Sequence, residues 1–129
     1  MALRSLIVDD NAHFLAAARA LLERQGIAVV GVASSCAEAV RLAAKLQPDV
    51  ALVDIDLGDE SGFDVARRLA GAGGSALSPV VLISAYPEGD FAELIAASPA
   101  LGFLAKSNVS AENILELLRT SADGGQDGA

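Results

Sequence analysis

The sequence predicts an α/β protein, a doubly wound five-stranded parallel sheet covered by five helices. Short apolar runs rich in β-branched residues alternate along the chain with longer segments of helical period. The strand segments are apolar without alternation, which is typical of strands buried on both faces of a parallel sheet. Right-handed crossovers would then place helices on both faces of that sheet.

The predicted strands are short, and each is bounded by polar residues or by turn-forming residues. They are the segments 6–8, 28–33, 50–53, 80–84 and 101–105. Five strands of this kind, each followed by a predicted helix, give five βα units.

The first two predicted helices have clear start or stop signals. The first ends at Gly26, because glycine readily takes the left-handed conformation that closes helices. The second begins with a capping box, Ser35 to Glu38, and ends before Pro48. The apolar stripe of the first helix is Phe14, Leu15, Ala18, Leu21 and Leu22.

The remaining helices are predicted from caps and apolar spacing. The third runs over about 61–70 and leads into a glycine-rich stretch, 71–74, expected to be flexible. Pro87 suits the first turn of the fourth, and Ser110 caps the fifth. The predicted buried faces are Phe91, Leu94 and Ile95 for the fourth, and Ile114, Leu117 and Leu118 for the fifth.

Length and charge limit the function classes. The chain has 129 residues, which suits one domain over 1–120 and a disordered tail or linker start over 121–129. Its 9 basic and 17 acidic residues give a net charge of −8, which disfavours nucleic acid and anionic membranes as partners. No apolar run approaches the length of a membrane span. The single cysteine, Cys36, cannot form an internal disulfide, so we expect a cytoplasmic protein.

Polar residues follow four of the predicted strands. The first strand leads into Asp9 and Asp10, the third into Asp54, the fourth ends at Ser84, and the fifth is followed by Lys106. Because ligands of open α/β sheets bind beyond the carboxyl ends of the strands, we expect these side chains to form one site.

The chemistry of this set favours phosphoryl transfer. Carboxylates gathered in a partly desolvated cleft repel one another and attract a cation, and their hard oxygens suit Mg²⁺. Asp54, central in the sheet, is then the natural nucleophile toward phosphorus. Lys106 and the Ser84 hydroxyl could bind the phosphoryl oxygens.

Four motifs in order resemble the receiver domain of response regulators, the phosphoacceptor half of two-component signalling. They are Leu6-Ile7-Val8-Asp9-Asp10, Val53-Asp54-Ile55-Asp56-Leu57, Val81-Leu82-Ile83-Ser84-Ala85 and Phe103-Leu104-Ala105-Lys106. The resemblance covers about residues 3 to 120 and implies a flavodoxin-like, CheY-like sheet with strand order 2-1-3-4-5.

The resemblance implies a role for each acidic residue. Asp54 matches the phosphorylated aspartate and also a ligand of Mg²⁺. Asp10 matches the carboxylate that binds the metal directly, and Asp9 the neighbour that acts through water. Asp56 matches the position whose backbone carbonyl binds the metal.

The resemblance also implies a phosphoryl-binding set and a switch. Ser84, the backbone N–H of Ala85 and Lys106 match the groups that bind the phosphoryl oxygens. Ser84 and Phe103 match the switch pair, in which the aromatic ring turns inward when the hydroxyl moves. The chain would thus catalyse its own phosphorylation and dephosphorylation without being a conventional enzyme.

Two positions depart from the family pattern. Ser107 stands where proline often follows the lysine with a cis peptide bond, an isomer that costs about 2.5–4 kcal/mol before a non-proline residue. Gly58 replaces a frequent proline after the phosphoacceptor and predicts a more mobile loop. Neither departure removes a reacting group.

The implied partners are a histidine kinase or phosphotransfer protein and a downstream target or output domain, with a homodimer as a further option. Two alternatives stay open: a pseudo-receiver that binds proteins without phosphorylation, and an aspartate-nucleophile phosphatase of the haloacid-dehalogenase type. The phosphatase is disfavoured because its Asp-x-Asp motif belongs on the first strand. No G-x-G-x-x-G follows the first strand, and no basic helix-turn-helix pattern occurs in the chain.

Several of these residues also have purely structural interpretations. Asp9 and Asp10 could cap the first helix. Ser84 alone is typical of a turn, Lys106 alone of a surface charge, and Phe103 alone of a packed core position.

Overall fold

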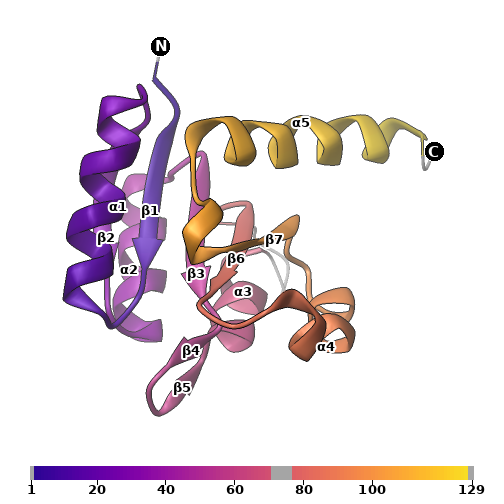
Figure 1. Ribbon diagram of the computed structural model, residues 1–129, viewed down its shortest axis with the longest axis horizontal. Coiled ribbons are helices and arrows are strands. Elements are labelled where there is room, and N and C mark those ends of the chain that lie inside the picture. Colours follow the sequence, from indigo (N-terminus) through magenta and orange to yellow (C-terminus); the bar gives the residue numbers. More distant parts are fainter. Residues whose placement is uncertain (1, 71–76, 128–129) are drawn as a thin grey trace.

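A five-stranded parallel sheet lies at the centre of the molecule (Figure 1). The computed structural model describes residues 2–70 and 77–127, and the side chains of those up to 120. The strands are β1 (Arg4–Val8), β2 (Ala28–Ala33), β3 (Val50–Asp54), β6 (Val80–Ser84) and β7 (Gly102–Ala105), in the order β2-β1-β3-β6-β7. Counted along the sheet's own strands, this is the predicted order 2-1-3-4-5.

Helices cover both faces of the sheet, as predicted. The helices α1 (Ala12–Arg24) and α5 (Ala111–Asp127) bury their apolar stripes in one core, around Ile7, Leu52 and Ile83. On the other face, α2 (Cys36–Leu46) and α3 (Gly62–Leu69) pack on a second core, around Leu6, Val53 and Leu82. Adjacent strand residues point to opposite faces, so these apolar strands supply both cores.

The register of the strands aligns their carboxyl ends. Val8 is the partner of Val53, Asp54 of Ile83, and Ser84 of Ala105. Every residue of β3 and β6 is buried, so a slip of one residue would exchange the side chains that pack in the two cores. The register therefore fixes where, along the strand direction, the polar residues that follow each strand lie.

The predicted helix caps are present. The Ser35 hydroxyl accepts the Glu38 N–H at 3.2 Å, and the Glu38 carboxylate reaches back to the Ser34 N–H at 2.9 Å. The Ser110 hydroxyl accepts the Asn113 N–H at 3.1 Å. Gly26, with φ of +91°, follows the end of α1. These ends depend on local hydrogen bonds, which explains why the sequence predicts them well.

The prediction for the fourth helix is wrong in one respect, the burial of Leu94. Pro87 precedes a 3-10 turn, η1 (Glu88–Phe91), and α4 is short (Ala92–Ala97). Phe91 and Ile95 pack against the core as predicted, but Leu94 is 55% exposed. The reason is that a helix of six residues has fewer than two turns, so it presents only a narrow stripe to the sheet.

The C-terminal helix is longer than the sequence predicts. The expected tail begins at 121, whereas α5 continues to Asp127, and Figure 1 shows its last turns extending beyond the sheet. A helix that is already nucleated gains one hydrogen bond for each residue it adds. The predicted glycine-rich loop 71–74 and residues 128–129 lie outside the described residues, and the division of the chain at 120 stays a prediction.

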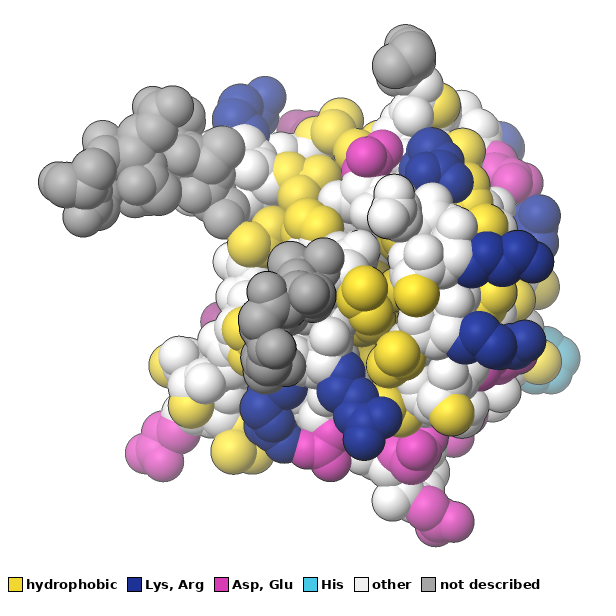
Figure 2. Space-filling view, turned by 180° about the vertical axis from the view of Figure 1, so that it is seen from behind, with side chains coloured by type: hydrophobic (Ala, Val, Ile, Leu, Met, Phe, Trp, Pro, Cys, Tyr) yellow, Lys and Arg dark blue, Asp and Glu magenta, His cyan; other side chains and the backbone are white. Residues whose placement is uncertain are grey.

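One face of the molecule carries both basic and acidic side chains. On the face drawn in Figure 2, the described Lys and Arg side chains lie in separate groups between hydrophobic and neutral ones, with acidic side chains mostly near the lower edge. Nucleic-acid sites usually gather basic residues in one stripe. No helix within 2–70 and 77–127 is long and apolar enough to cross a membrane.

Candidate functional site

The polar residues that follow the strands meet at the carboxyl edge of the sheet. They surround a cavity of about 240 Å³ beyond the ends of β1, β3, β6 and β7. Its lining residues are Asp10, Asn11, Asp54, Asp56, Gly58, Ser84, Ala85, Tyr86 and Lys106. The convergence predicted from the sequence is therefore present in the fold.

Three carboxylates cluster at this edge. Asp9, Asp10 and Asp54 each offer an oxygen, and these oxygens all lie within 4.8 Å of one another. Asp9 is fully buried and Asp54 is 6% exposed, whereas Asp10 is exposed. Carboxylates so close together repel one another, and the low polarity around the two buried ones strengthens that repulsion.

Lys106 neutralises part of the negative charge of these carboxylates. Its ammonium nitrogen Nζ lies 2.7 Å from Asp9 Oδ2 and 3.0 Å from Asp54 Oδ2, at 17% exposure of the side chain. Asp9 Oδ2 has no hydrogen-bond partner among the described residues, and the ammonium is its close contact. Three carboxylates against one ammonium still leave surplus negative charge. Hard oxygens and surplus negative charge are the properties that suit a divalent cation such as Mg²⁺.

Burial and close contacts shift the pKa values of Asp54 and Lys106. Burial raises the pKa of Asp54 above its usual value, although the Asp56 N–H and Lys106 oppose this shift. Burial alone would lower the pKa of Lys106, but its contacts with Asp9 and Asp54 outweigh burial and raise it. Lys106 is therefore held as an ammonium, whereas the burial of Asp54 disfavours the charged form of its carboxyl group.

The loop after Asp54 is a hairpin that the sequence does not predict. Its strands are β4 (Asp56–Leu57) and β5 (Glu60–Ser61), joined by Gly58 and Asp59. The Asp56 N–H donates to Asp54 Oδ1 at 3.1 Å, and the Gly58 N–H to Asp56 Oδ1 at 3.2 Å. Gly58 has φ of +71°, which proline cannot adopt, so glycine here permits a tight two-residue turn. The greater mobility predicted for this loop stays a prediction.

The family model described as the response regulator receiver domain matches residues 5–119. The chain belongs to the family of response regulator receiver domains. The doubly wound fold and the four ordered motifs of the sequence agree with this membership.

Curated relatives are longer than this receiver domain. A protein of Pseudomonas aeruginosa named as a transcriptional regulator is 35% identical over 113 residues, which are 88% of this chain and 52% of the relative. The transcriptional regulatory protein LiaR of Bacillus subtilis is 30% identical over 125 residues, 95% of this chain and 57% of LiaR. The chain thus spans about half the length of the curated relatives it matches.

Solved structures share the fold over nearly the whole chain. The signal receiver domain of a modulated diguanylate cyclase from Desulfovibrio desulfuricans is 32% identical with a TM-score of 0.77, and the match covers 100% of both chains. A response regulator from Burkholderia pseudomallei is 29% identical with a TM-score of 0.76, over 98% of this chain and 72% of that one. That structure contains a phosphorylated aspartic acid, a calcium ion and citrate.

The residues predicted to bind the phosphoryl group of the receiver domain border the cavity. Ser84 is almost fully buried, and its hydroxyl oxygen accepts the Tyr86 N–H at 2.9 Å. This hydrogen bond is the one expected if Ser84 had only a structural role in a turn. It leaves the Ser84 hydroxyl proton available to a second acceptor. Ala85 lines the cavity beside it. The Lys106–Ser107 peptide bond is trans.

The predicted switch aromatic lies away from the cavity. Phe103, in β7, is half-buried against the core that also contains Phe91 and Ile95. The ring therefore packs against the same core as Phe91 of η1 and Ile95 of α4. Its position is compatible with both the core role and the switch role.

Sequence reasoning left Asn11, Phe14 and Gly62 unassigned, although they lie in or beside the site. Asn11 lines the cavity and caps α1, and the N-cap preference of asparagine directly after two aspartates is a signal that could have placed it there. Phe14 lies over Lys106 although its spacing assigns it to the core stripe. Gly62 approaches the Asp54 backbone, and no local pattern shows that contact.

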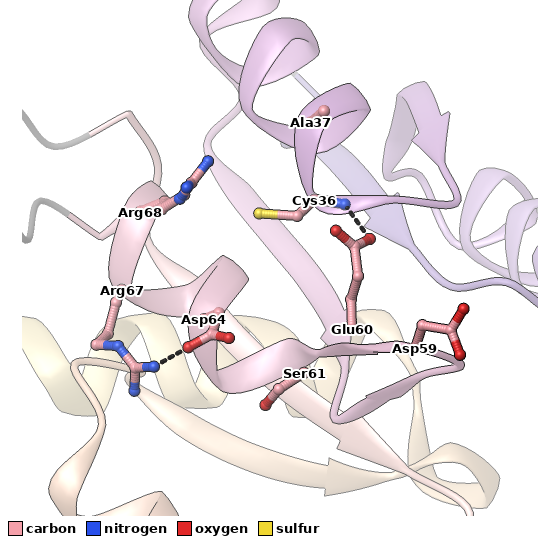
Figure 3. Close-up of a pocket in the computed structure, with 8 residues that line it drawn as sticks. All are labelled: Cys36, Ala37, Asp59, Glu60, Ser61, Asp64, Arg67 and Arg68. Carbon is pink, nitrogen blue, oxygen red and sulfur yellow. Dashed lines mark hydrogen bonds and ion pairs between the residues drawn. The ribbon is translucent and has the colours of Figure 1, made fainter.

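A second cavity, of about 590 Å³, lies between the start of α2 and the β5–α3 segment (Figure 3). There Glu60 accepts the Cys36 N–H at 2.8 Å, and Arg67 pairs with Asp64 on the surface. The Cys36 side chain is buried. Although larger, this cavity holds neither the carboxylate cluster nor Lys106.

Proposed function

We propose that this receiver domain accepts a phosphoryl group on Asp54. The observation that carries the proposal is the Lys106 ammonium, which lies within 3.0 Å of both Asp9 and Asp54 at the edge of a cavity. A lone structural ion pair would need one carboxylate, whereas here the ammonium contacts two carboxylates that belong to a cluster of three. A site with this charge pattern is suited to a bound cation and a transferred phosphoryl group.

In the proposed reaction, a carboxylate oxygen of Asp54 attacks the phosphorus of the donor. A P–O bond to Asp54 forms as the P–N bond of a phosphohistidine breaks, and the imidazole leaves with the electron pair. Lys106 offsets the negative charge on the phosphoryl oxygens, and the Ser84 hydroxyl and Ala85 N–H donate hydrogen bonds to them. Attack of water on the phosphorus later releases phosphate and restores the Asp54 carboxylate.

The acidic cluster is the proposed magnesium site. Asp10, Asp54 and the backbone carbonyl of Asp56 would hold Mg²⁺, with Asp9 acting through water. When bound, the ion supplies positive charge beside the phosphoryl oxygens. Support comes from the surplus negative charge of the cluster and from the calcium ion and phosphorylated aspartic acid in the Burkholderia response regulator.

The proposed donor is a histidine kinase or a phosphotransfer protein, and the proposed recipient of the signal is an output domain or a separate target. The regulatory names of the relatives support this assignment. We place the protein in the cytoplasm, because its cysteine is buried as a free thiol. A homodimer of the phosphorylated form is a further part of the proposal.

Incubation with acetyl phosphate and Mg²⁺ is expected to add one phosphoryl group to the chain, as seen by intact-protein mass spectrometry. Asp54→Asn should add none, because an amide is not a nucleophile toward phosphorus. Asp59→Asn, which changes an exposed carboxylate of the same loop, should be phosphorylated like the unchanged chain. EDTA should prevent the reaction in every variant.

Failure to form the adduct would be followed by a beryllofluoride binding experiment with Mg²⁺, since a short-lived phosphoryl group could escape detection. No binding of beryllofluoride would contradict the proposal and favour the pseudo-receiver. Turnover of an ordinary phosphate ester would favour the phosphatase, because such an ester is not a donor of high transfer potential.

Ser84 and Phe103 form the proposed switch. The new phosphoryl oxygens would attract the Ser84 hydroxyl from its turn position, and the Phe103 ring would move into the space released. Moving such an equilibrium from 1:99 to 99:1 requires about 5.5 kcal/mol of differential stabilisation. A phosphoryl group beside Lys106 is a new anion held by charge-assisted bonds, which can contribute energy of this size.

Ser84→Ala is expected to accept the phosphoryl group but to lose the conformational response at Phe103. The measurement is the change in the NMR signals of the Phe103 ring and of α4 on addition of beryllofluoride and Mg²⁺. Ser5→Ala is the matched control, because Ser5 is a buried serine at the opposite end of the sheet. Equal responses in Ser84→Ala and the unchanged chain would rule out the switch.

A further inference from the structure

The ring of Phe14 lies against the charged end of Lys106. The ammonium nitrogen is 4.5 Å from the centroid of the ring, well within the range of cation–π attraction. The same nitrogen contacts Asp9 and Asp54. Lys106 is thus held by two carboxylates and by an aromatic face, which comes from a different element, α1.

The start of α1 carries Phe14 to this position. Asp9 Oδ1 accepts the Asn11 N–H at 2.8 Å, and Asn11 Oδ1 accepts the Phe14 N–H at 3.1 Å. Asp9 uses its other oxygen, Oδ2, for Lys106. The buried Asp9 carboxylate therefore orients two groups, the first turn of α1 and the Lys106 ammonium. Phe14, the third residue of α1, contacts that ammonium.

We propose that Phe14 is a positioning residue, which holds the Lys106 ammonium at the mouth of the acidic cluster. An aromatic face attracts the cation without supplying a hydrogen-bond acceptor, so the N–H groups of Lys106 stay directed at oxygen atoms. A further carboxylate at this place would add to the surplus negative charge and compete with the phosphoryl oxygens for the ammonium. The kinetic part of this inference rests on the proposed phosphorylation of Asp54.

Packing alone gives Phe14 a second possible role. Phe14 is half-buried and also contacts the core that contains Ile7 and Leu22. If packing were its whole contribution, leucine would replace it with a small loss of stability and no specific effect on Lys106. If the aromatic face matters, tyrosine would replace it and leucine would not.

The first measurement is the chemical shift of the Lys106 ε-methylene protons by NMR. The chain has two lysines, Lys45 and Lys106, so the variant Lys45→Met assigns both signals. The ring current of Phe14 should shift the Lys106 signal upfield of the exposed Lys45 signal. Phe14→Leu should remove this shift and Phe14→Tyr should keep it. Coincident lysine signals in the unchanged chain would overturn the proposal.

The second measurement is the rate of phosphorylation by acetyl phosphate at saturating Mg²⁺. Phe14→Leu should lower this rate roughly threefold to tenfold, the range expected for loss of a partly desolvated cation–π contact, while Phe14→Tyr should stay within about twofold. Phe91→Leu is the matched control, because Phe91 is half-buried against the other core and should leave the rate unchanged.

The outcomes separate this inference from the proposed function. If the unchanged chain is phosphorylated but Phe14→Leu reacts at the same rate, the positioning role is wrong and the proposed function stands. If the unchanged chain is not phosphorylated and does not bind beryllofluoride with Mg²⁺, the proposed function fails, and the ε-methylene shift in Phe14→Leu and Phe14→Tyr alone decides whether the ring holds the ammonium. If Phe91→Leu slows the reaction as much as Phe14→Leu, the effect is one of packing and the proposal is overturned.

Discussion

Lys106→Met is expected to lower the free energy of unfolding by about 3–5 kcal/mol near neutral pH, the cost typical of removing one partner from a buried ion pair. Methionine keeps the length of the side chain but not its charge. Asp9, which is fully buried, and Asp54 would then face each other without the ammonium that lies within 3.0 Å of both. Urea unfolding of the metal-free chain measures the loss.

The loss of unfolding free energy in Lys106→Met should shrink as the pH falls. The pKa of Asp54 is already raised in the folded chain by burial, and removal of Lys106 raises it further. A carboxyl group with a raised pKa binds its proton more tightly in the folded state than in the unfolded state, so protonation favours folding. The deficit of Lys106→Met is therefore greatest above the raised pKa and declines as the pH falls through it.

Lys45→Met is the matched control for this experiment, because Lys45 is an exposed lysine of α2. It should change the free energy of unfolding by less than about 0.5 kcal/mol at any pH, as is usual for surface positions. If Lys106→Met proved no less stable than Lys45→Met at neutral pH, the three carboxylates would not depend on the ammonium.

Gly62→Ala is expected to destabilise the fold by about 3 kcal/mol or more, at the upper end for overpacking of a core. A Cβ atom at this position would overlap the backbone carbonyl group of Asp54 and lie 2.7 Å from the Cα atom of Ile55. Backbone atoms cannot rotate away as a side chain can. The Gly62 N–H also donates to the Ile55 carbonyl at 2.7 Å, which holds the two segments together.

Thermal unfolding would measure this effect, with Gly89→Ala as the control. Gly89 lies in η1 with no atom near the place of its missing Cβ, so its replacement should be nearly neutral. Gly62→Ala should also slow the proposed phosphorylation of Asp54 in any fraction that folds, since the clash displaces the proposed phosphoacceptor. A Gly62→Ala chain as stable as Gly89→Ala would show that the close approach is absent in solution.

Much of the fold could be predicted because its signals are local. The strands β3 and β6 are buried on both faces and therefore consist almost wholly of apolar residues. The caps at Ser35 and Ser110 depend on hydrogen bonds within one turn. Features carried by very short elements were missed. The exposure of Leu94 follows from the six-residue length of α4, and the hairpin around Gly58 has strands of only two residues, too short for a periodic signal.

The acidic cluster could also be predicted, for a physical reason. Parallel strands deliver their carboxyl ends to one edge of the sheet, so Asp9, Asp54 and Lys106 had to meet once the strands were recognised. Their separations, the burial of Asp9 and the division of its two oxygens between Asn11 and Lys106 could not be predicted, because they depend on strand register and side-chain packing.

The sequence by itself determined the doubly wound α/β class and the polar groups that meet at one edge of the sheet, because alternating strands and helices admit few topologies. Its four ordered motifs gave the resemblance to receiver domains, and that resemblance implied the strand order. Only the tertiary structure decided which side chains act together. Phe14 has the spacing of a core residue in its own helix, and it reaches the Lys106 ammonium because β1 and β7 end at the same edge of the sheet. Contacts between such distant segments leave no periodic trace in the sequence, since each segment satisfies its own local pattern.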